Sequence, residues 1–171
     1  MSVIAWDGKW LVADRQACDS GMRIATEKIA FRKDAIIAGS GYESSLLMFM
    51  RWYDEGADPA KWPECQKGDH WTKAVVMRKG EPLLYYERES VAIEITRDTE
   101  YMAWGSGADY AMGAMAMGAD AMQAVRIACK HCFECGHGLT AMWFDEHGEV
   151  CSHTENMNYA TEVDPHGLQA D

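Results

Sequence analysis

The sequence contains no uninterrupted apolar run close to the roughly 20 residues that a membrane-spanning helix needs. It also lacks, at its N-terminus, the basic segment and following apolar stretch of a secretory signal. Positive charge is scarce, with 16 Lys and Arg against 27 Asp and Glu and a net charge of -11. Because phosphate backbones are bound by clustered Lys and Arg, this balance argues against nucleic-acid binding. We therefore expect a cytoplasmic protein that binds neither membranes nor nucleic acids.

Internal repeats, low-complexity stretches and linkers are also absent, so the 171 residues are expected to form a single domain, 1–171, with a continuous core. Segment 152–171 is expected to be a poorly ordered C-terminal tail. Seven Trp and twelve Met indicate a large, adaptable interior or contact surface. The six Cys are expected to be free thiols, because disulfide frameworks are typical of secreted chains.

Strand and helix patterns occur in separate blocks along the chain. Asp7-Gly8 is a strong turn signal between strands at 3–6 and 10–13. Helical spacing predicts a first helix over 42–55, with Leu46, Leu47, Met50 and Tyr53 on one face. Two further helices are expected at 108–117 and 120–130, and 57–71 is expected to be a loop. The other expected strands are 28–31, 35–38, 74–77, 83–87, 91–95, 101–104, 139–144 and 150–152. Segregated blocks favour an α+β fold, here two sheets covered outside by helices.

Four elements together carry a resemblance to a known family. They are the Ser2 strand and hairpin that ends on Asp14, the Lys28 strand, Ala38-Gly39 before a helix, and the block Gly105-Ser106-Gly107-Ala-Asp-Tyr110-Ala-Met-Gly113-Ala114. Together they resemble the proteasome β-subunit superfamily of N-terminal nucleophile hydrolases, which includes the peptidase subunit of the bacterial ATP-dependent two-component protease. Within it, the chain is most similar to short proteasome-like proteins encoded by bacteriophages and prophages.

This resemblance covers most of the chain, from Ser2 to about Phe144. The Gly-Ser-Gly block followed by Tyr-Ala-x-Gly-Ala is its most specific part. The resemblance implies a four-layer αββα sandwich, in which two antiparallel sheets carry outer helices, and assembly into a homo-oligomeric ring.

Ser2 is the candidate nucleophile. Removal of Met1 would leave Ser2 at the N-terminus, where one residue carries both a hydroxyl and an amine that can act as its base. An α-amine has a pKa of about 7.7 to 8.0, so part of it is neutral at pH 7 and no histidine is required. A serine in second position is common, so this interpretation depends on the pattern downstream. If the nucleophile position falls on Met1 instead, the N-terminus carries no hydroxyl.

The resemblance implies four supporting catalytic residues. The Lys28 ammonium would lower the pKa of the hydroxyl and the amine, and Asp14 would orient it. Gly39 would donate its backbone N–H to the oxyanion, and Ser106 would hold the amine. Each residue also has an ordinary structural explanation: a surface ion pair, a glycine that releases a strand into a helix, or a turn serine that bonds neighbouring backbone.

The sequence departs from the family pattern in two places. Family members usually carry an Asp-x-x-Ser-Gly segment before the last strands, where this chain has Cys132-Phe-Glu-Cys135-Gly136. They also commonly place two long helices before the Gly-Ser-Gly turn, where only one is expected here. Both departures favour an alternative: a catalytically inactive structural or assembly subunit with the same fold.

A cysteine-rich segment offers a further alternative. Cys129, Cys132 and Cys135, with His131 and His137 beside them, have the local spacing of zinc ligands. A tetrahedral site needs four convergent ligands, however, and no second, distant Cys pair is present. Buried free Cys also often serves as a small apolar side chain. We expect no metal and no other cofactor.

The sequence therefore predicts an N-terminal serine peptidase that hydrolyses peptide bonds in peptides or unfolded proteins within a homo-oligomeric ring. An unfoldase that feeds such a ring is not identified by the sequence.

Overall fold

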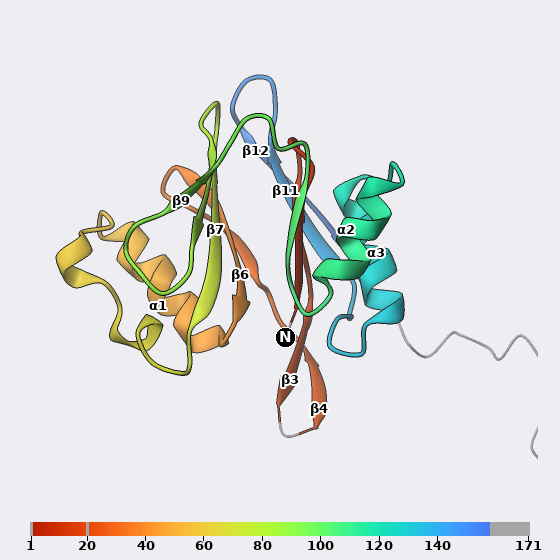
Figure 1. The fold of residues 1–171 in the computed structure, drawn as a ribbon, viewed down its shortest axis with the longest axis horizontal. Helices are drawn as coiled ribbons and strands as arrows, with labels where there is room; N and C mark the ends of the chain where they lie inside the picture. The colour runs from red at the N-terminus through yellow and green to blue at the C-terminus, as the bar shows by residue number, and fades with distance from the viewer. Residues whose placement is uncertain (1, 20, 158–171) are drawn as a thin grey trace, which may run out of the picture.

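The computed structural model describes residues 2–19 and 21–157. Two five-stranded antiparallel sheets and three α-helices make up most of it (Figure 1). The first sheet contains, in spatial order, β10 (Met102–Gly105), β1 (Val3–Trp6), β2 (Leu11–Asp14), β11 (Leu139–Phe144) and β12 (Val150–Glu155). The second contains β5 (Ile29–Arg32), β6 (Ala35–Gly41), β7 (Thr72–Arg78), β8 (Leu83–Tyr86) and β9 (Ile93–Ile95). The expected α+β class is confirmed.

Strand β1 is an interior strand of the first sheet and is buried on both faces. It pairs with β2 on one side and with β10 on the other, where Val3 lies opposite Gly105. Val3 and Ala5 contact one apolar cluster, whereas Ile4 contacts another, because successive side chains of a strand point to opposite faces. Ser2 and Val3 therefore lie inside the core.

Helices α2 (Ala108–Ala116) and α3 (Ala121–His131) cover one face of the first sheet (Figure 1). Asp120 begins α3 with a capping box, in which its side chain accepts from the Gln123 N–H and the Gln123 side chain accepts from the Asp120 N–H. The buried face of α3 has the helical spacing that the sequence predicts, and its residues are Ala121, Ala124, Val125, Ala128 and Cys129.

Helix α1 (Glu43–Asp54) covers the outer face of the second sheet. Leu46, Met50 and Tyr53 are buried as predicted, but Leu47 is 56% exposed. Phe49 and Trp52 take its place in the buried face, because they contact Trp62 and Tyr86 in an aromatic group. The expected loop after this helix contains two short 3₁₀ helices, η1 (Pro59–Lys61) and η2 (Glu64–Gln66).

The inner faces of the two sheets meet in a third apolar cluster. Ile4 and Leu11 of the first sheet belong to it together with Ile36, Val75 and Tyr85 of the second. Burial on both faces explains why these strands lack a polar–apolar alternation.

A short hairpin stands apart from both sheets and was not predicted from the sequence. Its strands are β3 (Gln16–Asp19) and β4 (Met22–Ala25), which pair only with each other. Figure 1 shows it extending beyond the sheets on the side of the N-terminus. Three of the four β4 residues are exposed, including Met22 and Ile24, so this strand adds no buried face to the core.

The predicted start of the C-terminal tail is wrong. Strand β12 continues to Glu155, and Ser152, His153 and Thr154 pair with Met142, Ala141 and Thr140. This strand is an edge strand with polar outward residues, which the hydrophobic pattern does not reveal. The rest of the predicted tail, from 158 to 171, lies outside the described residues.

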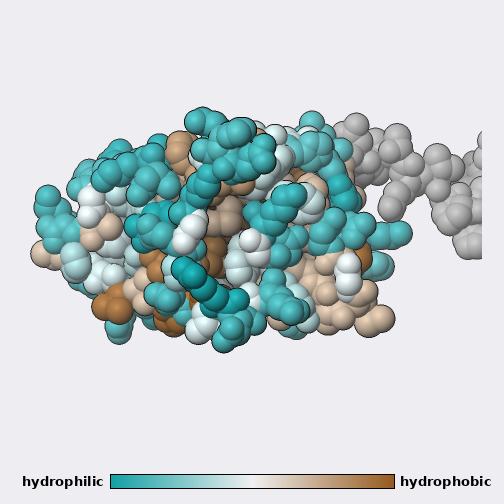
Figure 2. Space-filling view, turned by 90° about the horizontal axis from the view of Figure 1, so that it is seen from above, coloured by the Kyte–Doolittle hydropathy of each residue, from teal (hydrophilic) through white to brown (hydrophobic). Residues whose placement is uncertain are grey.

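The surface agrees with the composition. Figure 2 shows a mainly hydrophilic face on which hydrophobic residues are visible in small, separate groups. Among the described residues, no helix is long and apolar enough to cross a membrane.

Candidate functional site

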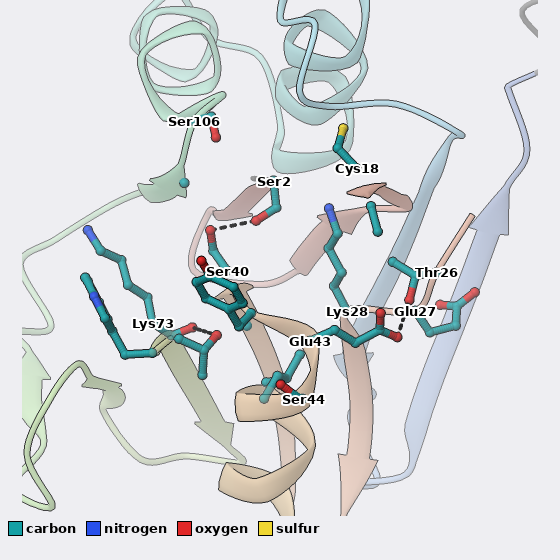
Figure 3. A pocket seen from close by; sticks show the side chains of 18 of the residues that line it. Ser2, Cys18, Thr26, Glu27, Lys28, Ser40, Glu43, Ser44, Lys73 and Ser106 are labelled. Carbon is teal, nitrogen blue, oxygen red and sulfur yellow. Dashed lines mark hydrogen bonds between the residues drawn. The ribbon is translucent and has the colours of Figure 1, made fainter. Parts of the chain in front are cut away.

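A cavity of about 820 Å³ opens where Ser2, directly before β1, meets the ends of several other elements. Ser2, Lys28, Gly39 and Ser106 all line it, so four of the five predicted catalytic residues lie around one space. The start of α1, the start of β7 and the β3–β4 hairpin complete the walls. Figure 3 shows Ser2 near the middle of this site, with Lys28 rising from β5 and Ser106 above.

Ser2 is buried, with 1% of its surface exposed. Its backbone is fixed by the turn before α2, because the Gly107 N–H donates to the Ser2 carbonyl at 3.2 Å. Its hydroxyl donates to the Ser40 hydroxyl at 2.6 Å. Ser2 is thus held through its backbone by the turn before α2 and through its hydroxyl by β6 of the second sheet.

Asp14, the fifth predicted residue, lies behind the cavity wall and is completely buried. Its Oδ1 accepts from Lys28 Nζ at 2.8 Å and from the Val3 N–H at 2.9 Å. Its Oδ2 accepts from the Gln16 and Gly136 N–H groups, both at 3.1 Å. One carboxylate oxygen therefore joins the Lys28 ammonium to the backbone of the residue that follows Ser2.

The Lys28–Asp14 pair is not the surface ion pair of the ordinary structural explanation. The Lys28 side chain is 9% exposed and that of Asp14 is 0% exposed. A buried ion pair needs further hydrogen bonds to offset the loss of hydration, and the three backbone N–H groups on Asp14 supply them. Lys28 comes directly before β5, and its carbonyl joins the β5–β6 pairing, which fixes the base of its side chain.

The Gly105-Ser106-Gly107 turn approaches Ser2 closely, as the sequence predicts. Gly105 has a φ of +95°, and a Cβ added there would lie 2.2 Å from the Ser2 carbonyl oxygen. A Cβ on Gly107 would lie 2.7 Å from the Cys135 sulfur. Ser106 lies between these glycines with its side chain exposed at the cavity. The two glycines are therefore required by contact distances, and they bring Ser106 to the site.

Gly39 lines the cavity, but its N–H is directed at the Lys28 carbonyl, to which it donates at 2.9 Å. This bond continues the β5–β6 pairing beyond the strand. A Cβ on Gly39 would lie 2.2 Å from a methyl carbon of Leu46, so the close packing of α1 requires the glycine. The geometry accounts for Gly39 structurally, and the expected oxyanion role would require its N–H to leave Lys28.

Ser40 is the main residue of the site that sequence reasoning missed. It follows Gly39 on β6, is 7% exposed, and receives the hydrogen bond from Ser2. The two serines are 38 positions apart, so no local motif connects them. The only sequence signal that could have identified Ser40 was its position as a hydroxyl residue between Gly39 and Gly41 at the end of a strand.

Acidic side chains gather at one side of the cavity. Glu43, the first residue of α1, accepts from the Thr26 hydroxyl at 2.7 Å. Glu27 is paired with Arg15 at 2.6 Å. These contacts tie the segment before β5 to α1 and to the first sheet, and Figure 3 shows them on the side of Lys28 away from Ser106.

The cysteine-rich segment packs into the core. Cys129 and Cys135 are buried in the cluster beneath α2 and α3. Burial raises the pKa of the Cys129 thiol to about 12 and also raises the pKa of the Cys135 thiol, which disfavours the thiolates that bind metals. In the part of the chain that the structure describes, no three His, Cys, Asp or Glu side chains are placed to hold a metal ion. The zinc alternative with Cys132 and His137 therefore gains no support.

This segment nevertheless contributes to the site through its backbone. Gly136, which follows Cys135, donates its N–H to Asp14 Oδ2. The position of the family aspartate, Cys132, is partly buried. The substitution of both polar residues by cysteine thus leaves the backbone contact to Asp14 in place.

No protein-family model matches the sequence, and no curated protein is similar to it. Among solved structures, a mutant of Anbu from Hyphomicrobium sp. strain MC1 has a similar fold, with a TM-score of 0.70 over 91% of this chain and 88% of that chain. Sequence identity is 11%, so the similarity concerns the fold alone. The chain therefore shares the fold of Anbu.

Proposed function

We propose that this chain is a proteasome-like N-terminal nucleophile peptidase, active after removal of Met1. The observation that carries the proposal is the shared Asp14 oxygen, which accepts from both Lys28 Nζ and the amide that follows Ser2. A positive charge fixed in this way beside an N-terminal serine favours the deprotonated forms of its hydroxyl and amine. The cavity in front of Ser2 would receive the peptide.

In this proposal the Ser2 hydroxyl attacks a peptide carbonyl carbon and its proton passes to the α-amine of the same residue. The protonated amine then gives a proton to the leaving nitrogen, and water hydrolyses the resulting ester. Lys28 supplies the positive field and Asp14 holds Lys28. Ser106, exposed at the cavity, would contact the amine. No cofactor takes part.

The proposal extends to architecture and assembly. The three apolar clusters, one between the sheets and one beneath the helices on each side, support the four-layer αββα arrangement of the superfamily. We also propose that the chain forms a homo-oligomeric ring, acts on peptides or unfolded proteins, and is related to the short phage-encoded members that its motifs resemble.

The test begins with the intact mass of the purified chain. We expect loss of the Met1 mass, followed by one covalent adduct on Ser2 after treatment with an epoxyketone or a β-lactone. A Ser2→Ala variant is the control and is expected to remain unmodified. Retention of Met1 would refute the peptidase proposal, because the Ser2 nitrogen would then be an amide without basicity.

A second candidate function is an inert assembly subunit with the same fold. Two observations favour it: the Gly39 N–H donates to Lys28 instead of facing the cavity, and Cys132 replaces the family aspartate. A mature Ser2 that reacts with neither probe, in a chain that still assembles, would support this function over the first.

A further inference from the structure

The hydrogen bond between Ser2 and Ser40 joins the candidate nucleophile to a hydroxyl from the other sheet. The two oxygens are 2.6 Å apart and both residues are buried. Among the described residues, this is the only hydrogen bond of the Ser40 side chain. A serine hydroxyl has one O–H and two lone pairs, so the O–H of Ser40 is not committed to another acceptor.

The position of Ser40 is fixed from several sides. It lies near the end of β6 and is paired with Lys73 on β7. A Cβ on Gly105 would lie 2.8 Å from the Ser40 hydroxyl and 2.2 Å from the Ser2 carbonyl oxygen, so the turn before α2 leaves no room for the two serines to separate on that side. The Ser2–Ser40 contact is thus held by both sheets and by this turn.

The proposed reaction needs an oxyanion donor in place of the expected one. The expected donor, the Gly39 N–H, is directed at the Lys28 carbonyl. Ser40 is the next residue along the same strand, and its hydroxyl touches the reacting oxygen of Ser2. Side-chain hydroxyls can serve in place of backbone N–H groups in such sites.

We infer that Ser40 is a catalytic residue, which orients the Ser2 hydroxyl before attack and donates its own O–H to the negative charge that develops during attack. This inference rests on the proposed peptidase function. As the Ser2 Oγ–carbon bond forms, the carbonyl electron pair moves onto the carbonyl oxygen and the Ser2 proton moves to the α-amine. Loss of the Ser2 proton ends the hydrogen bond that Ser40 accepts, and the O–H that Ser40 retains then donates to the negatively charged carbonyl oxygen. Collapse of the intermediate returns the electron pair to the carbonyl carbon and breaks the carbon–nitrogen bond, while the protonated α-amine gives its proton to the leaving nitrogen.

The test uses the full chain with a mature N-terminus and a β-lactone probe, with Ser2 modification followed by intact mass over time. For Ser40→Ala we expect the maximal modification rate to fall about 10²- to 10³-fold, the usual effect of losing one oxyanion donor. The probe concentration that gives half the maximal rate should change less than about twofold, because Ser40 acts after binding. Ser40→Thr, which restores a hydroxyl, should recover most of the rate.

Ser152→Ala is the matched control, since it removes an exposed hydroxyl from β12 outside the site. The rate is measured from pH 6 to 9 in each variant. If Ser40 is catalytic, Ser40→Ala should react more slowly at every pH, and the midpoint of its rate-against-pH curve should equal that of wild type. An unchanged rate in Ser40→Ala overturns the inference, as does a shift of the midpoint alone, which would mean that Ser40 acts through the amine.

The possible failures are distinguishable. If the mature wild-type chain does not react, the proposed function fails and Ser40 has no reaction to assist. If wild type reacts and Ser40→Ala reacts equally, only the Ser40 inference fails. If Ser40→Ala unfolds, Ser40→Thr and Ser40→Cys decide the question: the inference requires that Cys, a weaker donor of similar size, react much more slowly than Thr.

Discussion

At the residue scale, Asp14 determines how the site is built. Its two oxygens accept from Lys28, Val3, Gln16 and Gly136, which belong to four separate segments. Substitution of this buried carboxylate should lower the free energy of unfolding, because all four donors would lose their partner at once. The chemical role proposed for Lys28 therefore depends on a residue that also holds the fold together.

The stability of the buried pair can be measured. Asp14→Asn leaves the Lys28 ammonium buried without its counter-charge, so we expect the free energy of unfolding to fall by about 3–5 kcal/mol. Urea denaturation of the single variants and of Asp14→Asn with Lys28→Met measures their coupling. The double variant should lose less than the sum of the single losses. Simple additivity would mean that the two side chains do not interact.

The contact between Gly105 and Ser2 gives a second prediction at this scale. Gly105→Ala must place a Cβ at 2.2 Å from the Ser2 carbonyl oxygen, with a backbone φ of +95°. We expect a loss of more than about 1 kcal/mol in urea denaturation, together with loss of Ser2 reactivity.

Gly80→Ala is the control for the Gly105 variant. Gly80 has a similar φ of +74°, but nothing lies within 4 Å of an added Cβ. The loss of stability in Gly80→Ala therefore measures the backbone strain alone. Equal losses for the two variants would show that the contact with Ser2 adds nothing to that strain.

At the scale of the element, helix α3 was predicted well because its signals are local. Asp120 and Gln123 form the capping box, and the buried face repeats at helical spacing. Strand β1 was predicted from its apolar run and the Asp-Gly turn. The β3–β4 hairpin was missed because β4 is mostly exposed, and β12 extends past its predicted end because its polar residues pair at an edge.

Whether a signal is local in the sequence also distinguishes the predicted site residues from the one that was missed. Ser2, Asp14, Lys28 and Ser106 stand in motifs that can be read along the chain, and the structure brings the cavity-lining members together. Ser40 becomes visible only when β6 of one sheet faces the start of β1 in the other. Contacts across 38 residues leave no periodic signal in one sequence.

The N-terminus of α3 provides a prediction for this scale. Asp120→Ala removes the acceptor of the Gln123 N–H, which is 2.7 Å away. We expect the free energy of unfolding to fall by about 1 kcal/mol in urea denaturation. Asp120→Asn and Asp120→Ser keep a side-chain acceptor and should therefore retain most of the stability that Asp120→Ala loses. A full loss in these variants would contradict the capping role.

Helix α3 and strand β12 are also joined by a salt bridge whose effect depends on pH. Hydrogen bonds from Arg126 lower the pKa of Glu155 from 4.5 to about 2. The folded state therefore binds this proton less readily than the unfolded state. The stabilisation is fully present above about pH 4.5 and is lost as the pH falls towards 2.

The corresponding measurement is urea denaturation at several pH values between 5 and 2. Wild type should lose stability over this range faster than Glu155→Gln, which cannot titrate. If both chains show the same pH dependence, other carboxyl groups account for the acid sensitivity.

At the scale of the whole molecule, the chain combines the fold that it shares with Anbu and a net charge of -11. The ring proposal is tested by native mass spectrometry, in which we expect a homo-oligomer of defined subunit number. A chain that remains monomeric at tens of micromolar would contradict ring assembly. The probe reaction of Ser2 tests the chemistry separately, so the two results do not depend on each other.

The four-way coordination of Asp14 has a consequence for biogenesis. Segments from the beginning, the first hairpin and the far C-terminal half must all be in place before the Lys28 ammonium and Ser2 are aligned. Under the proposed function, a partly synthesised or misassembled chain would carry no competent nucleophile, and latency during synthesis would follow from the architecture without a separate inhibitor.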